Sequence, residues 1–75
     1  MNMQDKIKQQ KLDMWKEKLE ALEKEFPIIL QKKGEAAAMG DLRENSAFLA
    51  LEEDVHTFQA RINDIKRIIA QLERE

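Results

Sequence analysis

Apolar side chains recur at alternating spacings of three and four residues in two long stretches of the chain. The first series is Leu12, Trp15, Leu19, Leu22, Phe26, Ile29 and Ala36, with Lys33 as its one charged member, and the second is Phe48, Leu51, Val55, Phe58, Ile62, Ile65, Ile69 and Leu72. Such spacing places each series on one face of an α-helix. The pattern therefore predicts two helices, each with a coiled-coil seam.

The two series are mirror images about residue 42. In each mirror pair the two residue numbers add to 84, as they do for 12 with 72, 19 with 65 and 26 with 58. Seam residues of antiparallel helices must meet at a constant index sum, whereas a parallel dimer does not require this relation. We predict an all-α fold, an antiparallel coiled-coil helical hairpin of residues 11–75 with its tip near residues 40–45. Residues 1–10 lack mirror partners and are expected to form a frayed N-terminal extension.

Three residues that often interrupt or cap helices add local expectations. Gly40 can adopt the left-handed conformation that ends a first helix, and Asp41 can cap the second. Pro27 lies inside the first helical pattern, where it removes one backbone hydrogen bond and clashes with the preceding turn. We expect a kink or a helix break near Phe26.

The composition excludes several classes of function. A chain of 75 residues forms at most one domain and has little room for a deep catalytic pocket, so an autonomous enzyme is the least supported reading. The absence of cysteine excludes a disulfide framework and a thiolate metal site. The formal net charge of −2 lacks the positive excess of a stand-alone nucleic-acid binder. No apolar run is long enough for a membrane span or a signal peptide, so we expect a soluble, cytoplasmic protein without membrane contact.

The tip carries two acidic residues, Asp41 and Glu44, that allow two interpretations. Asp-x-x-Glu at the start of a helix is a capping-box pattern, in which the acids serve only the fold. Alternatively, two carboxylates at the end of a rod form an incomplete site for a hard cation such as Mg²⁺. That cation prefers a near-octahedral set of oxygen ligands, so the remaining ligands would come from water, substrate or another protein.

The tip sequence resembles the signature of the bacterial Gre transcript-cleavage factors. The resemblance rests on GDLRENSAF at residues 40–48 and RINDI at residues 61–65, with Pro27 and the pair Glu35-Ala36 at matching places. It implies a coiled coil that enters the secondary channel of bacterial RNA polymerase. There Asp41 and Glu44 would help the polymerase hold a second Mg²⁺ beside the 3′ end of the nascent RNA, and the polymerase would cut the RNA. The other tip residues implied to contact the partner are Gly40, Leu42, Arg43, Asn45 and Phe48.

The chain also departs from the family pattern. Ala37 and Glu52 stand where a basic residue that attracts RNA is common, which leaves Lys32, Lys33 and Arg43 as the cations near the tip. The C-terminal globular domain of the family is expected to be absent. Two further hypotheses therefore remain: a Gre-like inhibitor that occupies the channel, and a plain coiled-coil association module. The sequence does not determine whether the chain associates with itself.

Overall fold

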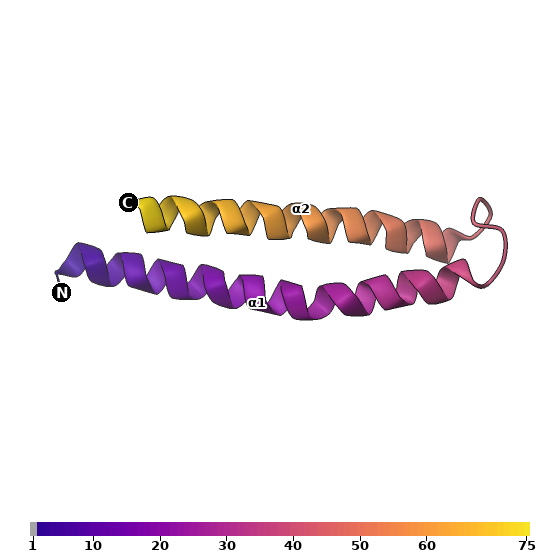
Figure 1. The fold of residues 1–75 in the computed structure, drawn as a ribbon, viewed down its shortest axis with the longest axis horizontal. Coiled ribbons are helices and arrows are strands. Elements are labelled where there is room, and N and C mark those ends of the chain that lie inside the picture. Colours follow the sequence, from indigo (N-terminus) through magenta and orange to yellow (C-terminus); the bar gives the residue numbers. More distant parts are fainter. Residues whose placement is uncertain (1) are drawn as a thin grey trace.

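The structure, a computed structural model, describes residues 2–75 and consists of two antiparallel helices joined at a tight tip (Figure 1). Helix α1 comprises Met3–Ala37 and helix α2 comprises Ser46–Arg74, with residues 38–45 between them. The hairpin is a thin rod with extents of 59 × 16 × 13 Å. The predicted all-α hairpin with its tip near residues 40–45 is confirmed.

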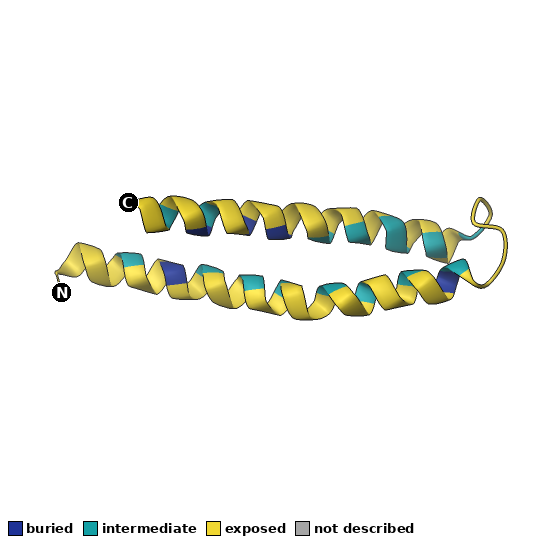
Figure 2. Cartoon of the chain, viewed as in Figure 1, coloured by how far each residue is buried: buried dark blue, intermediate teal, exposed yellow. Residues whose placement is uncertain are grey.

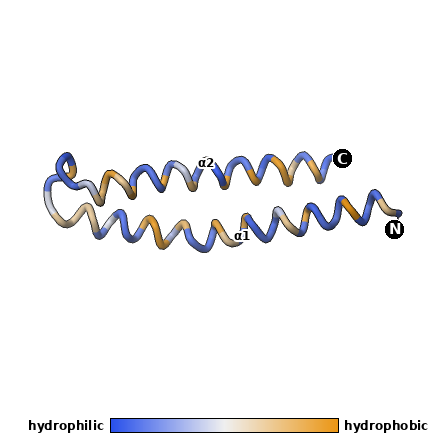
Figure 3. Tube along the Cα trace, turned by 180° about the vertical axis from the view of Figure 1, so that it is seen from behind, coloured by the Kyte–Doolittle hydropathy of each residue, from blue (hydrophilic) through white to orange (hydrophobic). Residues whose placement is uncertain are grey.

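Burial follows the predicted seam. Every seam position from Leu12 to Ala36 and from Phe48 to Leu72 is buried or half-buried, and Figure 2 shows these residues on the facing sides of the two helices. The remaining half-buried residues of the described chain are Lys8, Ala37, Asn45, Glu52 and Ile68. Figure 3 shows the corresponding alternation of hydrophobic and hydrophilic positions along both helices. The two predicted seams therefore form the contact between the helices.

A cluster of buried residues lies at the open end of the hairpin, away from the tip. Leu12, Ile65 and Ile69 form the buried core there, and Trp15, Leu19, Leu22 and Leu72 pack against them. Toward the tip the seam contains Lys33, whose ammonium lies 5.7 Å from the centroid of the Phe48 ring. A cation over an aromatic face is a favourable contact, so the charged seam residue has an electrostatic partner within the fold.

The N-terminal segment differs from the expectation, and the helix break that was one of the two alternatives at Pro27 does not occur. Residues 3–10 are helical rather than frayed, because Asn2 caps α1 by accepting a 2.8 Å hydrogen bond from the backbone N–H of Asp5. Met1 lies outside the described residues. Helix α1 also continues unbroken through Pro27, and Figure 1 shows it bowed over its length. Pro27 has no N–H to donate to the carbonyl of Glu23, four residues earlier. Both residues are exposed, so this carbonyl can bind water instead.

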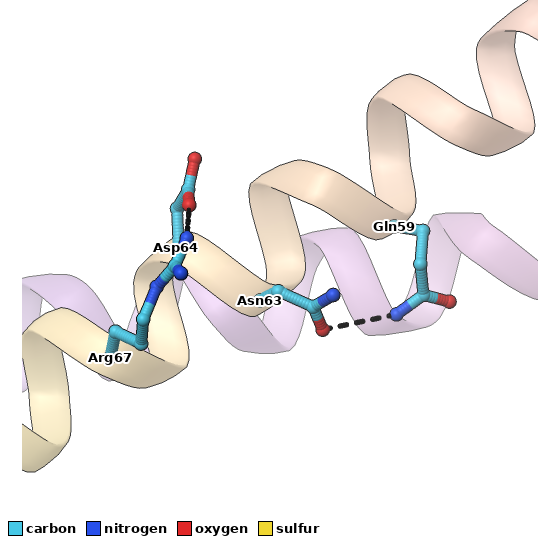
Figure 4. Close-up of polar contacts among 4 residues, drawn as sticks. All are labelled: Gln59, Asn63, Asp64 and Arg67. Atoms are coloured by element: carbon cyan, nitrogen blue, oxygen red, sulfur yellow. Dashed lines mark hydrogen bonds and ion pairs between the residues drawn. The ribbon is translucent and has the colours of Figure 1, made fainter.

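Surface charges pair along the edges of the rod. Lys16 and Glu73 join the two helices at 3.6 Å. On α2, Gln59 donates a 3.2 Å hydrogen bond to Asn63 and Arg67 pairs with Asp64 (Figure 4). The two contacts on α2 join residues three or four apart, and each contributes about 0.2 to 0.5 kcal/mol. No helix within residues 2–75 is long and apolar enough to cross a membrane.

Candidate functional site

The tip begins where α1 ends, at Ala37, and a short turn reverses the chain. Ala38 caps the helix, with its backbone N–H bonded to the Glu35 carbonyl at 3.2 Å, and the Met39 N–H bonds to the Ala36 carbonyl at 3.1 Å. Gly40 then adopts a φ of +135°, which L side chains rarely adopt. Glycine is thus required in the reversal as predicted, although α1 has already ended before it.

Asp41 shapes the turn and does not cap α2. Its Oδ1 accepts a 2.9 Å hydrogen bond from the backbone N–H of Arg43, an Asx-type turn, and its Oδ2 lies 3.5 Å from Arg43 Nη2. The backbone N–H of Glu44 bonds to the Asp41 carbonyl at 3.2 Å. Helix α2 begins only at Ser46, so the predicted cap at Asp41, and the capping box with Glu44, are wrong. The turn absorbs residues 41–44 because a better cap follows.

That cap is Asn45, which bonds to both helices at once. Its Oδ1 accepts a 3.0 Å hydrogen bond from the Phe48 N–H in the first turn of α2. Its Nδ2 donates a 2.7 Å hydrogen bond to the Ala36 carbonyl at the end of α1. The amide thereby satisfies the free N–H of Phe48 at the start of α2 and adds a second hydrogen bond to the Ala36 carbonyl at the end of α1. Asn45 fixes the end of α1 against the start of α2 and so defines the geometry of the tip.

The two tip acids are solvent-exposed and close in sequence and space. Asp41 and Glu44 line one shallow, open hollow of about 350 Å³, together with Met39, Asn45, Ser46 and Ala47. The hydrogen bonds and ion pairs found in residues 2–75 do not include the Glu44 carboxylate, which leaves it available to a partner. The fold therefore presents both acids at the extreme end of the rod.

The tip meets only part of the requirement of a metal site. Within the described chain no three His, Cys, Asp or Glu side chains come together where they could hold a metal ion. Asp41 and Glu44 are hard oxygen donors of the kind that Mg²⁺ prefers, but they supply two groups where about six ligand positions must be filled. These two carboxylates leave most ligand positions of such an ion unfilled by the described chain.

The other predicted tip residues divide into exposed and structural ones. Gly40, Leu42 and Arg43 are exposed, and Leu42 is the apolar member of this group at 41% exposure. Asn45 and Phe48 are half-buried, Asn45 as the cap and Phe48 in the seam. Met39 was not among the predicted contacts, yet it is 79% exposed beside the acids. Exposed apolar side chains therefore accompany the acids at the tip.

The cations near the tip are largely engaged within the chain. Arg43 pairs with Asp41, and Lys33 lies over Phe48, while Lys32 is exposed. The half-buried positions Ala37 and Glu52 add no positive charge beside the seam. The electrostatics of the tip are therefore set by exposed carboxylates rather than by a basic patch.

Comparison with known protein families agrees with this geometry. Residues 6–73 match the family described as "Transcription elongation factor, N-terminal", to which the GreA and GreB factors give their names. Comparison with curated proteins and with solved structures gave no match. The family match covers nearly the whole chain, including both helices and the tip. The chain therefore belongs to the family of N-terminal domains of the Gre transcription elongation factors.

Proposed function

We propose that this chain is the polymerase-inserting part of a transcription elongation factor that stimulates cleavage of backtracked RNA. The observation that carries the proposal is the exposure of Asp41 and Glu44 at the end of a rod whose family is that of the Gre factors. A rod 16 × 13 Å across is narrow enough to reach an active site through a channel. The partner is bacterial RNA polymerase, and the scissile chemistry belongs to the polymerase.

Within this proposal each tip residue has a defined task. Asp41 and Glu44 offer carboxylate oxygens to a Mg²⁺ shared with the polymerase, and Asn45 holds the turn that orients them. A second metal ion at a phosphodiester activates water and stabilises the leaving oxygen. Arg43 competes for the Asp41 carboxylate in the free chain, so Asp41 must exchange this exposed ion pair for the metal. Exposed pairs are weak, about 0 to 1 kcal/mol, so that exchange is easy.

A second candidate function is inhibition by occupying the channel. Two of the three cations near the tip already have partners inside the chain, and Glu52 stands beside the seam where a basic residue would attract RNA. A rod that enters without drawing RNA into place would block the channel rather than assist cleavage. The two candidates share the binding step and differ in the sign of their effect.

The test uses stalled polymerase complexes containing backtracked RNA labelled at its 5′ end. The chain is titrated alone and as a fusion to a Gre-type C-terminal domain, because a thin polar tip offers little apolar area and is expected to bind weakly by itself. Asp41→Asn and Glu44→Gln remove the charge with little change of shape. Glu53→Gln, at an exposed position of α2, is the matched control.

The proposal expects cleavage above the intrinsic rate for the unmodified chain and for the Glu53 variant. Either tip variant should lower the stimulation by at least about tenfold, as for the loss of one charge-bearing group at a reacting centre. Inhibition of both cleavage and RNA extension by the unmodified chain would favour the second candidate. Full stimulation by the Asp41→Asn, Glu44→Gln double variant would exclude a metal-binding role for these acids.

A further inference from the structure

Helix α1 carries a column of apolar residues on its outer face that the hairpin does not use. Ile7, Met14 and Ile28 are 44%, 45% and 52% exposed, and Ala21 is also exposed. Successive members are seven residues apart, so they recur about every two helical turns, or roughly 10.5 Å along the axis. We call these four residues the outer column. Met14, Ala21 and Ile28 each directly precede a seam residue, and Ile7 precedes Lys8, where the same spacing continues. One residue along a helix is a rotation of about 100°, so the outer column points away from the contact with α2.

Charged residues of alternating sign flank the middle of the outer column. In a helix the residues three and four positions after a column member lie on opposite sides of it. After Met14 these flanking residues are Glu17 and Lys18, and after Ala21 they are Lys24 and Glu25. One side of the outer column thus carries Glu17 and then Lys24, and the other side carries Lys18 and then Glu25.

We propose that the outer column is a self-association surface, on which a second copy of this chain packs with its α1 parallel to the first. Two-fold symmetry along the rod places each column residue against its own counterpart, as in any isologous contact. It also brings Lys18 of one copy beside Glu17 of the other, and Glu25 beside Lys24. Each of these charge contacts occurs twice. The charge pattern is therefore complementary to itself.

The antiparallel alternative is less favourable. With the two-fold axis at Ala21, Ile7 would face Glu35 of the second copy, and Lys11 would approach Lys32. The parallel arrangement keeps Ile7 against Ile7 and places Lys11 and Lys32 beside Gln10 and Gln31. It buries the whole column and opposes no like charges across the contact, which selects the parallel orientation.

The contact is expected to be weak. Four column residues make an interface below the roughly 1,000 Å² of stable complexes. Two of the flanking cations also have partners within the chain: Lys24 pairs with Glu20 at 2.9 Å, and the Lys18 ammonium lies 5.3 Å from the Trp15 ring centroid. We expect dimerisation at protein concentrations on the order of hundreds of micromolar.

Sedimentation equilibrium from about 20 µM to about 1 mM tests the proposal at concentrations where a small interface is populated. The unmodified chain should pass from monomer to dimer, and Met14→Glu should lower the association constant at least about tenfold. Lys18→Glu and Glu17→Lys each oppose like charges twice and should weaken association about three- to tenfold. The double variant restores opposite signs and should return the constant to within about twofold of the original.

A charge-matched control separates the local contact from net charge. Glu53→Lys, on the exposed face of α2, changes the net charge by the same amount as Glu17→Lys and should leave association unchanged. Circular dichroism verifies that each variant is folded. A chain that stays monomeric to about 1 mM, or a dimer indifferent to Met14→Glu, would overturn the proposal. If the two single charge reversals weaken association and the double variant does not restore it, the assigned flanking pairs are also wrong.

Disulfide trapping tests the orientation, because the chain has no cysteine. Met14→Cys places two thiols face to face in the parallel dimer and should give a covalent dimer under mild oxidation. In the antiparallel arrangement position 14 would meet position 28, so rapid linkage would need both substitutions. Ala60→Cys, exposed on α2, measures random collision. Equal linkage at positions 14 and 60 would refute the parallel contact.

Discussion

Asn45 offers a quantitative test of how the tip is built, because one side chain bonds to both helices. Its bond to the Phe48 N–H is a helix cap worth about 1 kcal/mol. Its 2.7 Å bond to the Ala36 carbonyl has a net value of about 1 kcal/mol. Asn45→Ala removes both and should lower the free energy of unfolding by about 2 kcal/mol. Asn45→Ser keeps a capping oxygen but has no amide donor, so it should lose about 1 kcal/mol.

Thermal unfolding followed by circular dichroism separates these outcomes. For a domain of this size 1 kcal/mol shifts the melting temperature by about 4 to 8 °C, so the Ala variant should melt about 8 to 16 °C lower and the Ser variant about 4 to 8 °C lower. Asn63→Ala, an exposed asparagine on α2 whose partner is Gln59, is the control and should change stability by less than about 0.5 kcal/mol (Figure 4). A Ser variant as stable as the original would show that the bond to Ala36 contributes nothing and that Asn45 is only a cap.

Three further predictions concern the rod. Ile65 is 8% exposed in the core, and Ile65→Ala should lower the free energy of unfolding in urea by on the order of 2 to 4 kcal/mol. Leu49 is 49% exposed, and Leu49→Ala should lower it little. Equal effects would contradict the assigned seam. Pro27→Ala should raise the free energy of unfolding by up to about 3 kcal/mol by restoring a helical hydrogen bond, and a fall in melting temperature would show that the proline fits a required bend. Lys16→Ala breaks an exposed ion pair and should change stability by less than about 1 kcal/mol, measured in low and high salt; a larger, salt-independent loss would mean that the Lys16 stem matters through packing.

The fold was predictable because two independent sequence signals agreed. The three-four spacing identified the helices, whose seams are buried at positions such as Ile62 and Ile65. The constant index sum predicted that the helices fold back on each other, and the structure is such a hairpin. Even Lys33 occupies its predicted seam position, where Phe48 accommodates its charge. Periodicity extends over many residues, so an error at one position does not change the result.

The details of the tip were less predictable because they depend on competition among neighbouring caps. Asp41 and Asn45 are both favoured capping residues, and sequence alone does not rank them. Asn45 has an amide donor that Asp41 lacks, and this donor reaches the Ala36 carbonyl only once the two helices are paired. Its cap is therefore reinforced by a contact between segments nine residues apart. The bond between Asp41 and the Arg43 N–H is local, and it was missed because Asp41 was assigned to the cap of α2 instead of an Asx-type turn.

The most direct test of the proposed function is the Mg²⁺ dependence of RNA cleavage in stalled polymerase complexes. If Asp41 and Glu44 help to hold a shared metal ion, the unmodified chain should lower the Mg²⁺ concentration needed for half-maximal cleavage. Asp41→Asn or Glu44→Gln should shift that concentration upward again, and added Mg²⁺ should partly restore the rate. The melting temperature of each variant should stay within about 4 °C of the original, because neither acid caps a helix. A Mg²⁺ requirement that is the same with the unmodified chain, with either variant and with polymerase alone would contradict the account.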